Sequence, residues 1–459
     1  MADGAGFGDR LRARRRSSAL SQQELAERSG LSIRAISNLE SGRTRWPYPN
    51  SVGRLADALA LRGDERAEFT AAAQRRLAHE PGTARPREGH GYIPRLLPAP
   101  VPAFTGRVSE LKTLSHTLSD PDGTTLVTTI TGAAGVGKTA LAVHWAHRAA
   151  GEFPDGQLSV NLRGTGPSAL PLTSLDAVRL LLGAQGIPAR QLPDPAEAQL
   201  GLYHSMLAGK RMLIILDNAR DAAQIRPLLP GSPTCRVIVT SRNQLPGLTA
   251  IEAARPLTVP TLTDAEARQL LARRLGPAAI AAHPAAAAQL ISSCAGLPLA
   301  LCIIAARAEL RPDLSLARLA ADLANQPVLD TFTGMADPTA DIRASFSWSY
   351  LQLDDLAART FRLAGLHPAA SIEPAAIAAL ARVTPALARR ALETLARASL
   401  IQTRGHELYS MNTLLRAYAL EQAIRHKEQA NRAARPAAIR KHGQRRTGTS
   451  PSAPSRTDR

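Results

Sequence analysis

Hydrophobic and polar positions divide the chain into segments of different periodicity. From Phe104 to about Gly247, short β-branched runs alternate with helical patterns. The runs are TTLVTTIT (124–131), GQLSVNL (156–162), RMLIILD (211–217) and CRVIVTS (235–241). Alternation of strands and helices predicts a parallel sheet in an α/β domain. From Thr263 to about Ala423 the pattern becomes helical, and the sequence TDAE at Thr263–Glu266 predicts a capping box that opens a helix.

The flanking segments have different compositions. Residues 7–78 predict several short helices, residues 79–103 are rich in Pro and Gly and predict a linker, and residues 426–459 are polar and basic and predict a disordered tail. We therefore expect a multidomain chain with an all-α head, an α/β domain with a parallel sheet, and helical domains after it. The expected boundaries are 1–78, 79–103, 104–255, 256–335, 336–425 and 426–459.

Residues 20–47, LSQQELAERSGLSIRAISNLESGRTRWP, have the pattern of a helix-turn-helix. Ser21 is placed to cap a first helix, Gly30 to make the turn and Ser32 to cap a second helix. Ile36 and Leu39 then fall on the buried face of the second helix. Such a helix pair either binds double-stranded DNA or mediates only protein contact.

This head resembles the lambda-repressor-like family, also called the XRE family, over about residues 7–75. The resemblance implies that the second helix enters the major groove of double-stranded DNA, where Ile33, Arg34 and Asn38 contact bases. Arg and Asn match guanine and adenine edges respectively. The resemblance also implies that Gln22, Arg43, Thr44 and Arg45 contact phosphates. Because one such head usually binds DNA weakly, a dimer or higher oligomer is expected.

The sequence GAAGVGKT, Gly132–Thr139, matches a phosphate-binding loop between a hydrophobic strand and a helical run. Its glycines let backbone N–H groups turn toward phosphate oxygens, Lys138 reaches the β- and γ-phosphates, and Thr139 offers a hydroxyl to Mg²⁺. The pattern predicts ATP or ADP as ligand. The predicted nucleotide contacts of this loop are Gly132, Ala133, Ala134, Gly135, Val136, Gly137, Lys138, Thr139 and Ala140.

Asp217 ends the hydrophobic run RMLIILD and is predicted to share the Mg²⁺ with Thr139. The next residue is Asn218, where many rapidly hydrolysing ATPases have a second carboxylate that polarises water. Its amide cannot accept a proton at neutral pH, so we expect slow hydrolysis at most. This favours a switch over a motor.

Three further motifs flank the loop: FTGRVSEL at 104–111 lies before it, and VIVTSRN at 237–243 and GLPLA at 296–300 lie after it. Together with the loop they resemble the NB-ARC branch of the STAND ATPases, and most closely the AfsR-type family of actinobacterial regulators, over about residues 100–425. The resemblance implies that Arg107 lies on the adenine–ribose side, that Pro298 packs near the base and that Arg242 senses the terminal phosphate. Lys138, Asp217 and Arg242 would then be the catalytic group.

Residues 346–368 and 387–420 resemble the winged-helix part of that family. The family usually reads Met-His-Asp where this chain has Met411, Asn412 and Thr413. The His contacts the β-phosphate of ADP in the family. Asn412 retains hydrogen-bonding capacity without charge, so we expect a nucleotide contact there and either a weakened ADP-bound state or a protein that no longer cycles between nucleotides.

Composition adds a bias toward polyanionic partners. The chain has 56 Lys and Arg against 38 Asp and Glu, a net charge of +18, which codon bias toward Arg also explains. The cysteines, Cys235, Cys294 and Cys302, have no metal-binding spacing. The start lacks an apolar signal region and no run of about 18 apolar residues exists, so we expect a cytoplasmic protein without a membrane span. Trp145 and Trp348 are predicted to be packing residues on helix faces.

Two classes of function follow. The first is a DNA-binding transcription regulator whose conformation or homo-oligomeric state responds to ATP and ADP. The second is a signalling or defence scaffold whose head recruits a protein partner. A dedicated ATP-consuming enzyme is disfavoured by Asn218 and by the absence of a second catalytic motif in the sequence.

Overall fold

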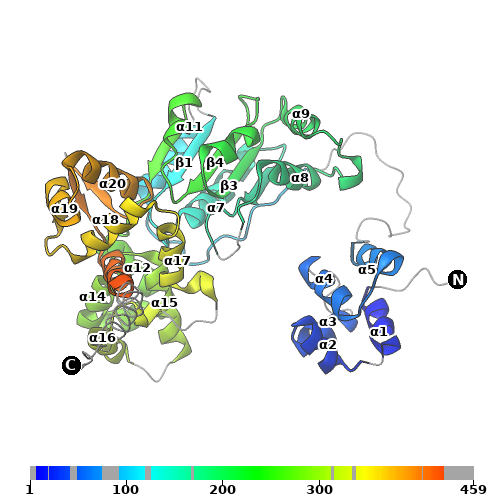
Figure 1. Ribbon diagram of the computed structural model, residues 1–459, viewed down its shortest axis with the longest axis horizontal. Helices are drawn as coiled ribbons and strands as arrows, with labels where there is room; N and C mark the ends of the chain where they lie inside the picture. Colours follow the sequence, from blue (N-terminus) through cyan, green and yellow to red (C-terminus); the bar gives the residue numbers. More distant parts are fainter. Residues whose placement is uncertain are drawn as a thin grey trace, which may run out of the picture. The chain divides into compact units, whose positions relative to one another are not determined.

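The computed structural model describes residues 7–18, 20–41, 49–74, 93–118, 126–166, 170–311, 315–332, 337–405 and 407–427. The chain forms two compact units, Met1–His90 and Gly91–Arg459. The elements of each unit are labelled in Figure 1. Most of the predicted basic tail, from residue 428 onward, lies outside the described residues.

The first unit is helical, as predicted. Its second and third helices begin where the sequence places them. Ser21 and Glu24 form a reciprocal capping box, and Ser32 accepts a hydrogen bond from the amide of Ala35. Gly30 ends the second helix in the left-handed conformation, with φ of 61°. The helices are α1 (Phe7–Ser17), α2 (Gln22–Ser29), α3 (Ile33–Glu40), α4 (Pro49–Ala58) and α5 (Gly63–Gln74), and Leu11, Leu25, Ile36 and Leu55 are fully buried between them.

The second unit contains a five-stranded sheet with every pair of neighbouring strands parallel. Four strands match the predicted runs, and the order is β2-β3-β4-β1-β5. The fifth strand carries Pro256, which the sequence pattern did not identify as strand. Proline is tolerated there because β5 lies at the sheet edge. The strands are β1 (Val127–Thr131), β2 (Gln157–Asn161), β3 (Leu213–Ala219), β4 (Arg236–Ser241) and β5 (Arg255–Thr258).

Side chains that alternate along the strands supply two separate cores. Ile130, Ile215 and Ile238 pack on the face covered by α7 (Lys138–Ala149). Ile214 and Val237 belong to the other core, which includes α8 (Ser174–Ala184) and α9 (Ala196–Leu207). Burial of both faces explains why the strand sequences are nearly continuous apolar runs. The remaining helical elements around this sheet are α6 (Val108–Leu118), η1 (Ala150–Glu152), η2 (Ala189–Gln191), α10 (Ala222–Ile225), η3 (Arg226–Leu228) and α11 (Pro246–Ile251).

A helical segment follows the sheet. The predicted capping box is confirmed, because Thr263 and Glu266 satisfy each other's backbone amides at the start of its first helix. These helices pack against one another and share the α7-side core (Figure 1). They are α12 (Asp264–Leu275), α13 (Pro277–Ala282), α14 (Pro284–Ser293), α15 (Pro298–Leu310) and α16 (Leu316–Asn325), followed by η4 (Asp330–Phe332) and η5 (Pro338–Ala340).

The last described region combines helices with a small antiparallel sheet of order β6-β8-β7. Its aromatic core includes Phe346, Phe361 and Tyr418. The elements are α17 (Ile342–Tyr350), α18 (Asp355–Leu366), β6 (Ser371–Ile372), α19 (Pro374–Ala381), α20 (Pro385–Arg397), β7 (Gln402–Arg404) and β8 (Leu408–Ser410), and residues 413–427 are helical.

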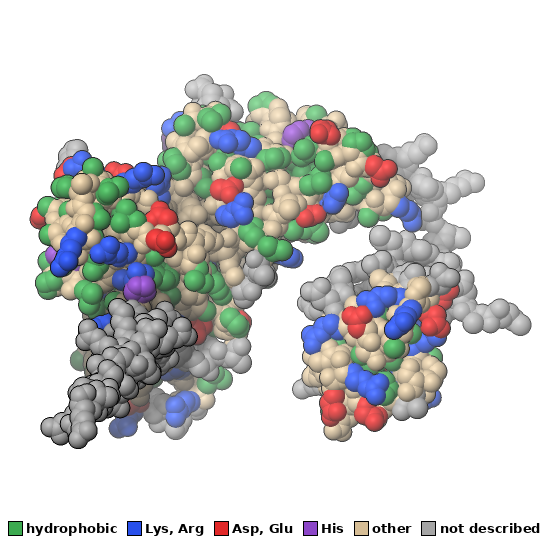
Figure 2. Space-filling model, viewed as in Figure 1, with side chains coloured by type: hydrophobic (Ala, Val, Ile, Leu, Met, Phe, Trp, Pro, Cys, Tyr) green, Lys and Arg blue, Asp and Glu red, His purple; other side chains and the backbone are tan. Residues whose placement is uncertain are grey.

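The surface carries both signs of charge. On the visible face of each unit, basic and acidic side chains are interspersed and do not gather into one continuous basic patch (Figure 2). Within the described part of the chain, no helix combines the length and the apolar character that a membrane crossing needs.

Candidate nucleotide site and helix-turn-helix head

The predicted phosphate loop joins β1 to α7 and depends on glycine at two close approaches. Gly132 has φ of 148°, and a Cβ there would lie 2.7 Å from the Val259 carbonyl oxygen. Gly135 has φ of 74°, and its Cβ would lie 2.9 Å from Cβ of Leu299. Both positions therefore exclude a side chain for steric and conformational reasons. The amide of Leu299 also donates to the Gly135 carbonyl at 3.1 Å, which fixes the loop against the start of α15.

Lys138 begins α7 and directs its ammonium group back into the loop. Its Nζ donates to the carbonyl oxygens of Gly132 and Ala133, each at 2.8 Å. Burial and the nearby Arg242 guanidinium lower the pKa of Lys138 to about 7, against the opposing effect of Asp217. The ammonium is thus poorly solvated, which makes it a strong partner for an anion.

Asp217 and Thr139 lie side by side, as the sequence predicted for a shared cation. The Thr139 hydroxyl donates to Oδ1 of Asp217 at 2.6 Å, and the Thr240 hydroxyl donates to the same oxygen at 2.6 Å. One carboxylate and one hydroxyl at the mouth of a phosphate loop are the hard oxygen ligands that Mg²⁺ takes in such sites. The residues present fit that ion.

A cavity of about 790 Å³ lies above the loop. Its lining combines apolar walls with several charged and polar groups, as in a site for a phosphate-bearing ligand of nucleotide size. Among the predicted site residues, the cavity brings together Arg107, Gly135, Val136, Gly137, Lys138, Thr139, Ala140, Asp217, Arg242 and Pro298. It does not include Gly132, Ala133, Ala134 or Asn412.

Arg107 borders this cavity, but its guanidinium is engaged by the protein. The side chain is 4% exposed and donates to Glu110 Oε1 at 3.3 Å and to the Val136 carbonyl at 3.1 Å. Its backbone is in the left-handed region, with φ of 63°, and its amide donates to Glu266 at 2.8 Å. In this arrangement Arg107 supports the phosphate loop, whereas the family resemblance placed it beside the base and ribose.

We expect Arg107→Gln to weaken the binding of ADP and of inosine diphosphate by the same factor, about tenfold, because a lost charge-assisted hydrogen bond to the loop affects every nucleotide. Dissociation constants measured by calorimetry provide the test. The exposed Lys112, on α6, gives a control as Lys112→Ala, which should change neither constant. A loss for ADP alone would show instead that Arg107 reads the base.

Arg242 follows β4 and connects the cavity to the C-terminal region. Its Nη1 donates to the Ser345 carbonyl at 2.5 Å and lies 3.4 Å from the Ser349 hydroxyl, both on α17. The guanidinium carbon lies 5.3 Å from the ring centroid of Trp348. Burial lowers the pKa of Arg242 to about 10, which leaves it charged at neutral pH. Arg242 therefore borders the cavity while it holds α17.

Asn218 has φ of 57°, a conformation that asparagine adopts more readily than most residues. Its side chain exchanges two hydrogen bonds with Thr165, at 2.7 and 2.6 Å. Its backbone carbonyl accepts a hydrogen bond from the amide of Gly164 at 2.7 Å. The residue after Asp217 thus secures the segment that follows β2. Its amide is not directed freely into the cavity.

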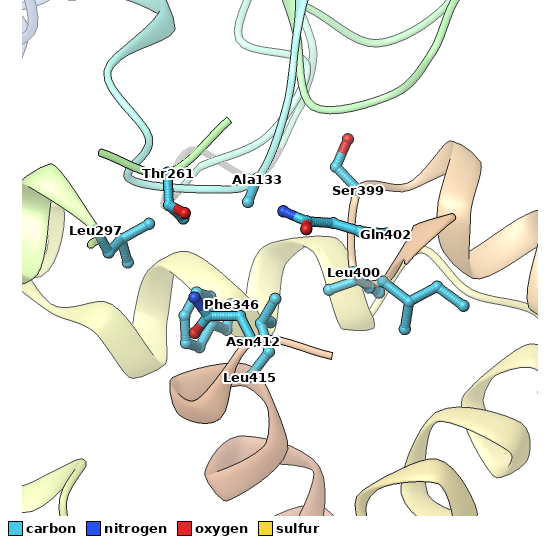
Figure 3. A pocket seen from close by; sticks show the side chains of 10 residues that line it. Ala133, Thr261, Leu297, Phe346, Ser399, Leu400, Gln402, Asn412 and Leu415 are labelled. Atoms are coloured by element: carbon cyan, nitrogen blue, oxygen red, sulfur yellow. The ribbon is translucent and has the colours of Figure 1, made fainter. Parts of the chain in front are cut away.

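Asn412 lies outside the large cavity. Its Nδ2 donates to the Ala295 carbonyl at 3.2 Å, and its Oδ1 accepts from the amide of Leu414 at the start of the last helix. Figure 3 shows a small separate pocket, bordered by Ala133 on the loop side and by Asn412 and Leu415 on the other. The predicted nucleotide contact of Asn412 and the weakened ADP-bound state stay predictions.

In the head, α3 carries the residues predicted to contact bases. Ile33 is 49% exposed and Asn38 is half-buried, while the side chain of Arg34 is not described. Gln22, a predicted phosphate contact, donates from its amide to Glu40 at 2.8 Å. The remaining predicted phosphate contacts, Arg43, Thr44 and Arg45, lie outside the described residues.

The sequence missed many of the residues that line the cavity, and Trp348 and Val101 are two examples. Trp348 was predicted to be only a packing residue, yet it lines the cavity beside Arg242. Trp145, in contrast, is 4% exposed in the core, as expected. Val101 belongs to the predicted linker, but the described part of that segment forms cavity wall. A proline-rich composition indicated irregular structure and gave no signal of this contact.

Fold and site together define a helix-turn-helix head joined to a P-loop-type α/β domain with a helical C-terminal region. The helix-turn-helix domain model matches residues 7–69. The chain is 38% identical over 379 residues to the regulatory protein AfsR of Streptomyces griseus, which covers 81% of this chain and 38% of that relative. It is 35% identical over 396 residues to AfsR of Streptomyces coelicolor, a match that covers 84% of this chain and 39% of that relative.

These matches confirm the resemblance to AfsR-type regulators over four fifths of the chain. The chain spans about two fifths of the length of these relatives. A Walker-type ATPase of Pyrococcus abyssi is similar in structure at 13% identity, with a TM-score of 0.48, and the similarity covers 69% of this chain and 96% of that one.

Proposed function

We propose that this chain is a DNA-binding transcriptional regulator whose conformation or oligomeric state is switched by ATP and ADP in an NB-ARC-type module. The helix-turn-helix domain and the homology to proteins named as regulators support the DNA-binding half. Residues Ile33, Arg34 and Asn38 would contact bases. Gln22, Arg43, Thr44 and Arg45 would contact phosphates and set the register on the duplex.

The nucleotide half rests on the loop and its neighbours. Lys138 and the backbone amides of the loop would bind the phosphates, and Pro298 would pack against the base. Thr139 and Asp217 would hold Mg²⁺. When bound, the ion supplies positive charge that neutralises the phosphates. Asn218, held by Thr165, offers no carboxylate to take a proton from water, so ATP hydrolysis would be slow.

The observation that carries the switch is the double position of Arg242. It borders the nucleotide cavity, yet it hydrogen-bonds Ser345 and contacts Trp348 on α17. With ATP, Arg242 would exchange these bonds for the terminal phosphate and release α17. With ADP it would keep them. The two nucleotides would then favour different arrangements of the C-terminal region. The size of the shift would depend on how much more tightly each nucleotide binds one arrangement than the other.

A released C-terminal region would expose surfaces for assembly of several copies of the chain. Paired heads then read repeated half-sites with greater affinity than a single head. In this scheme the winged-helix region, 336–425, is the moving part, and the homo-oligomer is the ATP-bound form.

A gel shift with fragments of genomic DNA tests the proposal. With wild type, we expect a non-hydrolysable ATP analogue to strengthen retention of specific fragments at least about tenfold over ADP. In Arg242→Ala, retention should become the same with both nucleotides. Arg268→Ala, an exposed arginine on α12, should behave as wild type.

Each other outcome has a defined meaning. No retained fragment with either nucleotide would contradict DNA binding and favour a scaffold whose head recruits a protein. Equal retention by the wild type with both nucleotides would contradict the switch.

A further inference from the structure

Residues 93–105, called the strap here, run from the sheet edge to the nucleotide cavity. At the first end, Arg95 forms a parallel bridge with Gln157 at the start of β2, the edge strand. The amide of Gln157 donates to the Pro94 carbonyl at 2.8 Å, and the amide of Leu96 donates to the Gln157 carbonyl at 3.0 Å. Pro94 is buried against Gly156, where a Cβ would lie 2.5 Å from the Pro94 oxygen.

The middle of the strap crosses the outside of α7. Nε2 of His147 lies 2.8 Å from the Pro98 carbonyl, the geometry of a donated hydrogen bond. Starting with Pro98, every second residue up to position 102 is proline. Proline lacks an amide hydrogen and restricts φ, so this stretch is stiff. Ala99 and Val101 are exposed to solvent, yet they line the nucleotide cavity. A bound ligand would therefore cover them.

The second end is fixed beside the cavity. The Phe104 ring stacks on His144 of α7, with centroids 4.0 Å apart and an interplanar angle of 9°. Arg273 of α12 donates to the Phe104 carbonyl at 2.6 Å. Phe104 also lines the cavity. This end is thus connected to α7, to α12 and to the ligand space at once.

We infer that nucleotide clamps the strap, so that occupancy of the cavity sets the point at which the chain toward the DNA-binding head leaves the second unit. The inference rests on the nucleotide binding proposed above. With the site filled, the nucleotide covers Ala99 and Val101, packs against Phe104 and holds the strap to α7 and β2. With the site empty, the ligand contacts at Ala99, Val101 and Phe104 are lost. The first end is then held only by its pairing with Gln157 and by the His147 contact to Pro98, and it detaches more often.

The consequence is a change in tether length. The strap is the part of the second unit that leads directly to the head in sequence. Detachment of residues 93–103, at about 3.3 Å each, adds up to about 35 Å of reach. A shorter tether restricts the separation of two heads, and effective concentration depends steeply on such spans. Nucleotide occupancy would thus select which half-site spacings a pair of heads can bridge.

Hydrogen exchange of the full chain tests this. Amides of Leu96, Leu97, Ala99 and Val101 are compared without nucleotide, with ADP and with a non-hydrolysable ATP analogue. We expect exchange at these amides to slow at least about tenfold with either nucleotide. Nucleotide binding is measured in parallel by calorimetry. Binding without slower exchange in the strap overturns the clamp alone, whereas no binding of either nucleotide overturns the clamp and the proposed nucleotide switch together.

A substitution on the strap side tests the same coupling in the opposite direction, because nucleotide binding and strap attachment must affect each other equally. His147 does not line the cavity, so His147→Ala touches only the strap side of the coupling. Because linkage is reciprocal, loosening the strap must lower nucleotide affinity, and we expect a three- to fivefold loss for both ADP and the ATP analogue. His116→Ala, at an exposed position of α6, is the matched control and should bind as wild type. Equal affinities in His147→Ala and His116→Ala would overturn the clamp.

Discussion

Replacement of Lys138 by alanine is expected to weaken the binding of both ATP and ADP on the order of 100-fold, equivalent to about 3 kcal/mol. The reason is the position of the ammonium. It lies in a poorly solvated loop, its pKa is lowered to about 7 by burial and by Arg242, and backbone carbonyls are its hydrogen-bond partners. A phosphate would give it a charged partner in place of two carbonyl dipoles.

Calorimetric dissociation constants for the two nucleotides measure this effect, and Lys112→Ala on the exposed side of α6 is the control. In the gel shift, Lys138→Ala should also remove every difference between the nucleotides. Wild-type affinity in Lys138→Ala would show that the loop is not the phosphate site. Wild-type nucleotide dependence of DNA binding, despite lost affinity, would separate the loop from the switch.

Replacement of Glu40 by glutamine is expected to lower the free energy of unfolding of the head by about 3 kcal/mol. The Glu40 side chain is 1% exposed and accepts from Arg15 at 2.6 and 3.0 Å and from Gln22 at 2.8 Å. Arg12 lies 3.8 Å away. The variant would leave Arg15 charged, largely buried and without its carboxylate, and breaking a buried pair in this way is costly.

Hydrogen exchange at amides of α2 and α3 in the full chain reports this loss, and amides of the sheet in the second unit serve as an internal reference. Glu27→Gln, on the exposed side of α2, should alter protection by less than about 0.5 kcal/mol. Equal protection in the two variants would contradict a stabilising role for the Glu40 cluster.

The cluster also predicts a pH dependence. Burial opposes ionisation of Glu40, but hydrogen bonds from Arg15 and Gln22 outweigh it and hold the pKa below its usual value. A depressed pKa in the folded state stabilises the head above the unfolded pKa, about 4.3. This contribution should remain constant at neutral pH and be lost only as the pH falls below about 4 and through the lowered pKa.

Much of the fold was predictable because it depends on local chemistry. Ser21, Gly30 and Ser32 place the ends of α2 and α3 through hydrogen bonds and backbone conformations that short motifs encode. Four strands of the sheet were evident as apolar runs, because both faces are buried. The edge strand β5 was not predicted, since edge position alone makes Pro256 acceptable and no local pattern shows which strand lies at an edge.

The candidate site shows a similar division. The loop, Asp217 and Arg242 follow from motifs, and the structure brings the second half of the loop, from Gly135 on, to one cavity with Asp217 and Arg242. The hydrogen-bond partners of Arg107, Asn218 and Asn412 could not be predicted from the sequence. Each of these residues bonds a residue that comes close to it only when the chain folds. Asn412, for example, donates to Ala295, which is 117 positions away in the chain.

The sequence by itself determined the head, the parallel sheet and the phosphate loop, because capping, burial and glycine conformations act over a few residues. Only the tertiary structure decided that Arg242 holds α17, that Trp348 borders the cavity and that Ala99, Val101 and Phe104 form part of its wall. Each of these contacts joins segments whose spacing in the chain carries no periodicity, and their meeting depends on how the sheet, the helical segment and the C-terminal region pack together.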